Sequence, residues 1–233
     1  RLIMRLKHKI YYIAIGVISS MKKIRFILCL TLAVILFQTV SFAAVKTGEF
    51  VILDENVDDV VKYITKGNGT PKKVADAYAG KEALYVGGTG GDGQRYNDKA
   101  PWTFKIAENP KADDEFRYIT FAWKKNGGTG IQLQLHGNPD TWGHRYHAGA
   151  NVKNWNPSIQ VNKSVPTKWE KHTRDLFKDW KAFTLTGIAF TAWPDGDDIG
   201  GFWDYVVLHQ NPEIQTPVES KGKLTTTWAK LKK

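Results

Sequence analysis

Cysteine is nearly absent from this 233-residue sequence, because its single cysteine, Cys29, lies in an apolar N-terminal segment. That segment has the features of an export signal, so the chain that remains after its removal would contain no cysteine. Disulfide bonds, thiolate zinc sites, iron–sulfur clusters and the CxxCH attachment of haem are therefore excluded there. We expect such a protein to be held together by its hydrophobic core.

The predicted export signal covers residues 21–43. Lys22, Lys23 and Arg25 form a positively charged start, residues 27–37 form the apolar stretch, and the expected cleavage site follows Ala43. A retained membrane anchor is the alternative, although the apolar stretch is shorter than the roughly 20 residues of a spanning helix. Residues 1–20 are interpreted as sequence upstream of the start at Met21, or else as an extension of the signal. The predicted destination is a periplasm-like compartment.

An excess of charge of one sign is also missing from the main part of the sequence. The formal net charge of the whole chain is +10, but seven of its 33 lysines and arginines lie in residues 1–43, where there is no acid. Residues 45–210 contain 21 basic and 21 acidic side chains. Nucleic-acid binding requires a basic surface, so DNA and RNA are excluded as expected partners.

Motifs of catalysis are missing as well. The sequence has no GxSxG nucleophile motif, and the glycine-rich residues 87–93 lack the Lys-Ser/Thr that completes a phosphate-binding loop. Glu170 with Asp175 or Asp179 is the only carboxylate pair that we would nominate for glycoside hydrolysis, and the sequence does not bring the two carboxylates together. We therefore predict a protein without catalytic residues.

Alternating apolar and polar residues are present in two neighbouring runs. In residues 130–136, Ile131, Leu133 and Leu135 alternate with polar side chains, which is typical of a half-buried strand. Residues 116–123 are apolar on both faces, which is typical of a central strand in a sandwich. The Asn126-Gly127 turn signal between them predicts that the two runs form a hairpin.

Short strands between turn signals are expected throughout residues 44–210. The predicted fold class is an all-β, jelly-roll-like sandwich of two antiparallel sheets, forming one domain. A single helical turn is expected at residues 173–180, capped by Thr173. The expected strands are residues 49–53, 60–64, 83–86, 102–106, 116–123, 130–136, 145–148, 158–161, 169–173, 183–192 and 202–208.

The C-terminal segment, residues 211–233, departs from this pattern. It contains Pro212 and Pro217 and ends in a basic stretch. Apolar side chains at helical spacing accompany a lysine there, and these candidate partner-binding residues are Leu224, Trp228, Leu231 and Lys230. One interpretation is a short flexible tail, and the other is a segment that folds on docking to a protein partner or to another copy of the chain.

A resemblance emerges over residues 173–209, which read TRDLFKDWKAFTLTGIAFTAWPDGDDIGGFWDYVVLH. This pattern resembles secreted bacterial jelly-roll domains related to carbohydrate-binding and galactose-binding modules. The chain is also similar to the small tubule-forming accessory subunits of anammox nitrite oxidoreductase, which are exported and carry no cofactor. That second resemblance implies a structural role within a redox complex in the anammoxosome lumen, with no haem in this chain.

A polar and aromatic face is the candidate site for a sugar ligand. Aromatic rings stack on sugar C–H groups, while neighbouring carboxamides and imidazoles bind the hydroxyl groups. Many of the nine tryptophans are also expected in the core, and Trp123, Trp169 and Trp203 are assigned there. The candidate ligand residues are Gln132, Gln134, His136, Trp142, Tyr146, Trp155 and Trp193.

Two sets of residues are weighed as metal ligands. The first set, which could bind a transition metal, is His136, His144 and His147, with Asp140. The three-residue spacing of His144 and His147, however, does not place both on one face of a strand. Carboxylates at alternate loop positions suit calcium, with a further acid, Glu49 or Asp54, from the first strand; the set is Asp195, Asp197, Asp198 and Asp204. Hydrogen-bonded histidines and a solvated turn are the alternatives, so a structural calcium ion is the one cofactor considered.

Three functions are therefore compared. The leading interpretation is a non-catalytic accessory subunit that binds protein partners, with the C-terminal segment as part of the interface. The second is a carbohydrate-binding module that uses the face around Gln132, Gln134 and His136. The third is a glycan hydrolase of the same fold.

Overall fold

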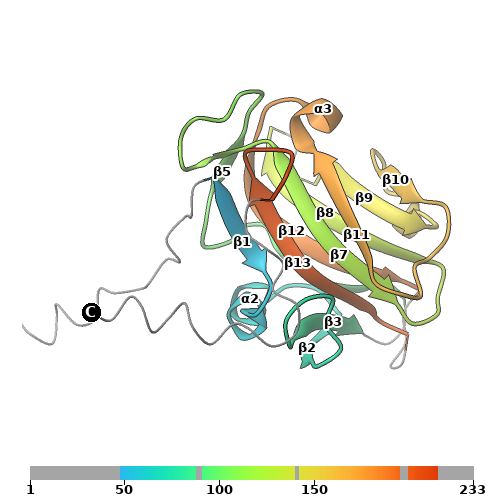
Figure 1. Ribbon diagram of the computed structural model, residues 1–233. Helices are drawn as coiled ribbons and strands as arrows, with labels where there is room; N and C mark the ends of the chain where they lie inside the picture. The colour runs from blue at the N-terminus through green and yellow to red at the C-terminus, as the bar shows by residue number, and fades with distance from the viewer. Residues whose placement is uncertain (1–47, 88–90, 140–141, 195–198, 215–233) are drawn as a thin grey trace, which may run out of the picture. The chain divides into compact units, whose positions relative to one another are not determined.

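Two β-sheets packed face to face form the part of the chain that the computed structural model describes, residues 48–87, 91–139, 142–194 and 199–214 (Figure 1). By its contacts the chain divides into residues 1–44 and residues 45–233, and every described residue belongs to the second unit. The predicted all-β sandwich is therefore confirmed. The predicted export signal and Leu224, Trp228, Lys230 and Leu231 lie outside the described residues.

The first sheet has the strand order β11-β7-β13-β3-β2, and β1 also pairs with β13. Its strands are β1 (Glu49–Leu53), β2 (Thr70–Val74), β3 (Ala83–Gly87), β7 (Tyr118–Lys125), β11 (Glu170–Asp175) and β13 (Gly201–His209). All of its pairs are antiparallel. β7 is flanked by β11 and β13, as the apolar residues on both of its faces predict.

The second sheet has the order β10-β9-β8-β12-β5-β6, and β4 also pairs with β12. Its strands are β4 (Gly93–Asn97), β5 (Phe104–Ile106), β6 (Glu115–Phe116), β8 (Gly130–Asn138), β9 (His144–Gly149), β10 (Ile159–Asn162) and β12 (Phe183–Trp193). β10 runs parallel to β9, and β6 runs parallel to β5. The prediction of wholly antiparallel sheets is therefore wrong for these two edge pairs.

The predicted hairpin between β7 and β8 is also wrong. Gly127 and Gly128 do adopt positive φ angles of 68° and 70°, so the turn itself is present. However, β7 pairs with β11 and β13 in the first sheet, whereas β8 pairs with β9 and β12 in the second. The turn therefore joins the two sheets, and the buried ammonium of Lys125 supports it by donating to the carbonyl of Ile199.

The core lies between the sheets and uses the alternation of the strands. From β8 it takes Ile131, Leu133 and Leu135, and from the facing β7 it takes Ile119, Phe121 and Trp123. These side chains are 0% exposed. Every second residue of β8 consequently lies on the opposite face, which we call the outer face of the second sheet.

The helices are short and lie at opposite ends of the sandwich (Figure 1). α2 (Val57–Tyr63) occupies a segment in which a strand was predicted at residues 60–64, because its buried residues Val57 and Val60 recur at helical rather than strand spacing. α3 (Leu176–Trp180) confirms the predicted helical turn. Its cap, however, is Asp175, which accepts a hydrogen bond from the Lys178 amide, and not Thr173.

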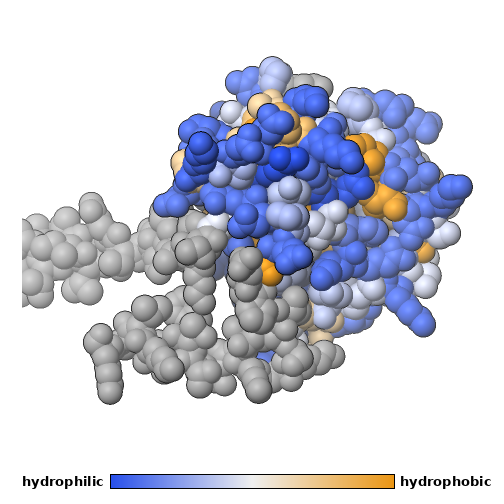
Figure 2. Space-filling model, turned by 45° about the horizontal axis from the view of Figure 1, so that its top comes forward, coloured by the Kyte–Doolittle hydropathy of each residue, from blue (hydrophilic) through white to orange (hydrophobic). Residues whose placement is uncertain are grey.

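The surface of the described residues is mainly polar. Val51, at 45% exposure, is the one large hydrophobic residue that the described part of the chain exposes. On the side drawn in Figure 2, hydrophobic residues form small and separate patches. Within the described ranges, no helix is long and apolar enough to cross a membrane.

Candidate ligand-binding face

The alternation of β8 places Gln132, Gln134 and His136 on the outer face of the second sheet, as predicted. Neither glutamine is exposed, however: Gln132 is 0% and Gln134 is 2% exposed, and His136 is half-buried. A face that was expected to be open is therefore partly covered.

Gln134 is fixed by the two strands beside β8. Its Oε1 accepts a hydrogen bond from Nε of Arg145 on β9 at 3.0 Å, and its Nε2 donates to Oγ1 of Thr191 on β12 at 2.9 Å. The guanidinium of Arg145 also donates to the carbonyl of Pro157 at 3.3 Å. The carboxamide of Gln134 thus forms a rigid polar floor between Arg145 and Thr191.

Three rings form one end of this face. The Trp142 ring stands edge-on to His136, with centroids 4.8 Å apart, and edge-on to Tyr96 of β4, with centroids 5.4 Å apart. Nδ1 of His136 lies 2.6 Å from Oγ1 of Thr186. Burial lowers the pKa of His136 below its ordinary value, while Asp98 partly opposes this shift, so the imidazole is neutral at pH 7.

Residues 150–158, which we call the strap, cover the other end. The strap contains the short helix η1 (Val152–Asn154), and its Trp155 lies under the guanidinium of Arg145, 5.9 Å from the ring centroid. Ser158 Oγ lies 2.7 Å from Nδ1 of His147, an outer-face residue of β9. Burial lowers the pKa of His147 as well.

Tyr146 does not belong to this face, which corrects the prediction. It alternates with Arg145 and His147 along β9, so it points between the sheets and is 0% exposed. Its hydroxyl donates to Oδ2 of Asp179 at 2.7 Å. Trp193, in contrast, is paired with Gly130 and shares the outer face with Thr191.

Sequence reasoning missed three members of the face, which are Tyr96, Arg145 and Thr191. Tyr96 was missed because the GQRYN sequence of β4 has no apolar alternation, and the strand was not predicted. Arg145 and Thr191 are positioned by the register of β9 and β12 against β8, which a single sequence does not reveal. The one feature of the sequence that could have indicated Arg145 as a member of this face is its polar side chain, two residues before His147.

The histidines do not converge on a metal. His136 and His147 lie on the outer face, while His144 points inward and stacks on Phe183 with centroids 3.9 Å apart. Among the described residues, no group of three or more potential ligands is placed to hold a metal ion. Asp140, the fourth candidate, lies outside them.

Of the four aspartates predicted to bind calcium, the structure describes Asp204 alone. Asp195, Asp197 and Asp198 lie outside the described residues. Asp204 is 0% exposed, and its carboxylate accepts hydrogen bonds from the backbone amides of Tyr78, Ala79 and Tyr205. These three bonds give Asp204 a structural role, and calcium binding remains a prediction.

The buried carboxyl group of Asp204 interacts with the half-buried carboxyl group of Asp54. Burial raises the pKa of Asp204 to about 7, and the charge of Asp54 adds to this shift. Burial also raises the pKa of Asp54 to about 6, with further contributions from Glu55 and Glu82. The two groups therefore hold their protons more tightly in the folded protein than in the unfolded chain.

The nominated catalytic carboxylates are engaged elsewhere. Glu170 accepts two hydrogen bonds from the Asn162 amide, and Asp175 binds Arg117. Glu170 and Asp175 project to opposite faces of β11, and five residues along a strand span roughly 16 Å. Asp179 accepts a bidentate contact from Arg174. The structure does not bring these carboxylates together as a catalytic pair.

Known proteins similar to this chain are found among solved structures. No protein-family model matches the chain, and no curated protein matches its sequence. One of the similar solved structures is the family 11 carbohydrate-binding module of Clostridium thermocellum, solved in complex with a β-1,3-1,4-mixed-linked tetrasaccharide. It is 12% identical to this chain with a TM-score of 0.37, and the match covers 72% of this chain and 99% of the module. CBM27-1 of Caldicellulosiruptor saccharolyticus, in complex with mannohexaose, is 12% identical with a TM-score of 0.40 over the same shares.

A third similar structure is an enzyme. The glycoside hydrolase domain Spr0440, Endo-D, of Streptococcus pneumoniae R6 is 15% identical with a TM-score of 0.41, covering 66% of this chain. This chain spans only 22% of the length of that structure. At these identities the three comparisons concern the β-sandwich alone.

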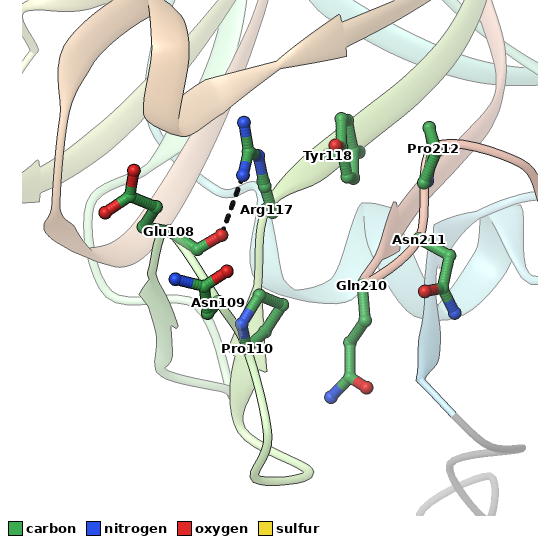
Figure 3. Close-up of a pocket in the computed structure, with 8 residues that line it drawn as sticks. All are labelled: Glu108, Asn109, Pro110, Arg117, Tyr118, Gln210, Asn211 and Pro212. Atoms are coloured by element: carbon green, nitrogen blue, oxygen red, sulfur yellow. Dashed lines mark hydrogen bonds between the residues drawn. The ribbon is translucent and has the colours of Figure 1, made fainter.

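A separate polar hollow lies away from the aromatic face. It has a volume of about 290 Å³ and is lined by the loop at Glu108 and Asn109, the start of β7 at Tyr118, and the end of the described chain at Asn211 (Figure 3). Arg117, which also lines this hollow, donates to the carbonyl of Glu108 at 2.8 Å. Tyr118 lies on the outer face of the first sheet, so the hollow is not continuous with the strap.

Proposed function

We propose that this protein binds a carbohydrate chain on the outer face of the second sheet and does not cleave it. The observation that carries this proposal is the position of Trp142, half-buried and edge-on to both His136 and Tyr96, beside the polar floor of Gln134. A tryptophan held upright beside fixed hydrogen-bonding groups suits a sugar ring, which offers C–H groups on its faces and hydroxyl groups on its rim.

The chemistry of the floor favours a neutral or weakly polar glycan. Gln134 and Thr191 are uncharged, and burial keeps His136 neutral near pH 7. Hydrogen bonds to such groups are fixed before binding, so little conformational entropy is lost when a sugar contacts them. The carbohydrate-binding modules with the same architecture are consistent with this proposal.

Binding without hydrolysis is the second half of the proposal. It is supported by the engagement of Glu170, Asp175 and Asp179 in separate structural contacts, none of them beside Trp142. A glycosidase requires two carboxyl groups about 5–10 Å apart across the scissile bond. The third interpretation, a glycan hydrolase, is therefore the least favoured.

The accessory-subunit interpretation remains a prediction. It depends on Leu224, Trp228, Lys230 and Leu231, which lie outside the described residues, and the described part exposes only Val51 among its large hydrophobic residues. Nothing in the described structure favours a redox complex or an anammox partner over a glycan. Export across a membrane is part of our proposal, because a glycan-binding protein needs access to extracellular polysaccharides.

The experiment that tests the proposal is affinity electrophoresis of the purified protein in gels containing cellulose derivatives, mixed-linkage β-glucan, xylan, mannan or peptidoglycan fragments. Retardation by at least one of them is expected, with no released sugars after overnight incubation. Migration that is unaffected by every polysaccharide would refute glycan binding. Release of reducing sugars, lost in Glu170→Gln or Asp179→Asn, would instead establish the hydrolase.

A further inference from the structure

The side chain of Gln132 is buried without a hydrogen-bond partner. It is 0% exposed, and among the described residues neither its Nε2 nor its Oε1 finds a partner. Its register neighbours on the outer face are His147 on β9 and Thr191 on β12, both buried and both bonded elsewhere. Burying an amide without partners destabilises a fold, so such a group calls for a functional explanation.

The strap covers part of the outer face on which these side chains lie. Val152 of η1 is 0% exposed and belongs to neither hydrophobic core cluster, while η1 lies against β8 and β12. Trp155 and Ser158 of the strap contact Arg145 and His147, which are outer-face residues of β9. The strap therefore crosses the outer face from β9 to β12, on the side of the sheet where Gln132 projects.

An ion pair joins the strap to the segment before β4 at its far side. Nζ of Lys153 lies 2.8 Å from Oδ1 of Asp92, the residue that precedes β4. The Lys153 side chain is 45% exposed, although that of Asp92 is only 11% exposed, so water competes with Asp92 for the ammonium group. Lys153 and Asn154 also adopt positive φ angles of 47° and 55°, which are unfavourable for lysine and tolerated by asparagine.

We propose that the strap is a movable cover and that Gln132 is a specificity-determining residue for a sugar unit that enters when the strap lifts. A carboxamide has one acceptor and one donor end, so it can bind two adjacent hydroxyl groups of a pyranose ring at once. The inference rests on the proposed function, because it adds a covered subsite next to the open one at Trp142.

The first test is Gln132→Met, which keeps the volume and removes the amide. Because the amide has no partner in the ligand-free fold, the melting temperature of the variant should be unchanged or higher by a few degrees. Its affinity for cellohexaose, xylohexaose or mannohexaose, whichever the wild type binds, should fall about tenfold or more, since both hydrogen bonds to the sugar are lost. Rescue is expected in Gln132→Asn only if the shorter amide still reaches the sugar.

The second test releases the strap. Asp92→Asn removes the ion pair with Lys153, and it should raise amide hydrogen exchange in residues 150–158 and increase the association rate of the same hexasaccharide several-fold. Asp59→Asn, which breaks the exposed Lys62–Asp59 pair on α2, is the matched control and should change neither quantity.

The outcomes separate the two proposals. Glycan binding in the wild type that Trp142→Ala abolishes and Gln132→Met leaves unchanged would overturn the inference alone. A lower melting temperature in Gln132→Met would overturn it as well, because the amide would then have a stabilising partner. Absence of binding in the wild type to every polysaccharide in the gels and to all three hexasaccharides would overturn the proposed function, and the covered subsite with it.

Discussion

The ring of Trp142 meets His136 edge-on, at 64° and with centroids 4.8 Å apart, so the indole is held upright over the outer face of the second sheet. Replacing Trp142 by alanine should lower glycan affinity by about 2 kcal/mol, or roughly thirtyfold, because the stacking surface for the sugar is lost. Isothermal titration with the polysaccharide retained in electrophoresis measures this change.

Trp169→Ala is the matched control for that prediction. Trp169 is another half-buried tryptophan, but it packs beside Tyr78 on the outer face of the first sheet. Its replacement should cost stability and leave affinity within about twofold of the wild type. Equal losses of affinity in the two variants would show that Trp142 acts only through the fold.

The raised pKa of Asp54 predicts an unusual dependence of stability on pH. Its pKa in the folded protein, about 6, lies above the ordinary 3.8, so the folded state binds the proton more tightly than the unfolded state does. The free energy of unfolding should therefore lose this contribution as the pH rises from about 4 to about 7. Asp54→Asn should match the wild type at pH 4 and be about 1–2 kcal/mol more stable at pH 8.

Urea unfolding at pH 4, 6 and 8 measures this difference, with EDTA present so that metal binding does not contribute. Asp113→Asn, a change at an exposed aspartate, provides the control and should leave the pH profile unchanged. A constant difference between Asp54→Asn and the wild type at all three values would contradict the raised pKa.

Asp179 should matter for stability and not for chemistry. Its carboxylate accepts from both Arg174 and the Tyr146 hydroxyl beside the core, and its side chain is only 12% exposed. Asp179→Ala leaves the guanidinium of Arg174 without its partner, so we expect a loss of about 2–3 kcal/mol in unfolding free energy. Arg174→Met combined with Asp179→Leu should recover most of it. A double variant as unstable as the single one would contradict this account.

The sequence predicted the fold better than the site. The alternation in residues 130–136 assigns one side of β8 to the core and the other to Gln132, Gln134 and His136, because period two is fixed by strand geometry. It says nothing about what covers the second side. The strap is positioned by contacts with the preceding strand β9 and with Asp92, and Asp92 is distant in the sequence, so the burial of Gln132 could not be predicted.

The pairing of strands is the other property that local sequence patterns do not determine. A glycine-rich turn such as Asn126-Gly127 serves a hairpin and a crossing between sheets equally well, since both need positive φ angles. Tyr146 shows the same limit within one strand. The sequence His-Arg-Tyr-His has polar or aromatic side chains on both faces, so only the register of β9 against β8 decides which residues face the core.

The C-terminal segment provides a test that separates the two leading functions. Ile214, near the end of the described residues, packs on the cluster of Ala122, Tyr205 and Val207 on the outer face of the first sheet. The proposed glycan face belongs to the other sheet. Deleting residues 215–233 should therefore leave both the melting temperature and the glycan affinity unchanged, within about 2 °C and twofold.

The same deletion tests the accessory-subunit prediction through native gel migration in extracts of the source cells. Loss of co-migration with a larger complex, at unchanged glycan affinity, would show that the C-terminal segment binds a protein partner independently of the sugar face. Loss of glycan affinity in the truncated protein would contradict the placement of the binding site on the second sheet, because no residue of that face lies beyond Trp193 in the described chain.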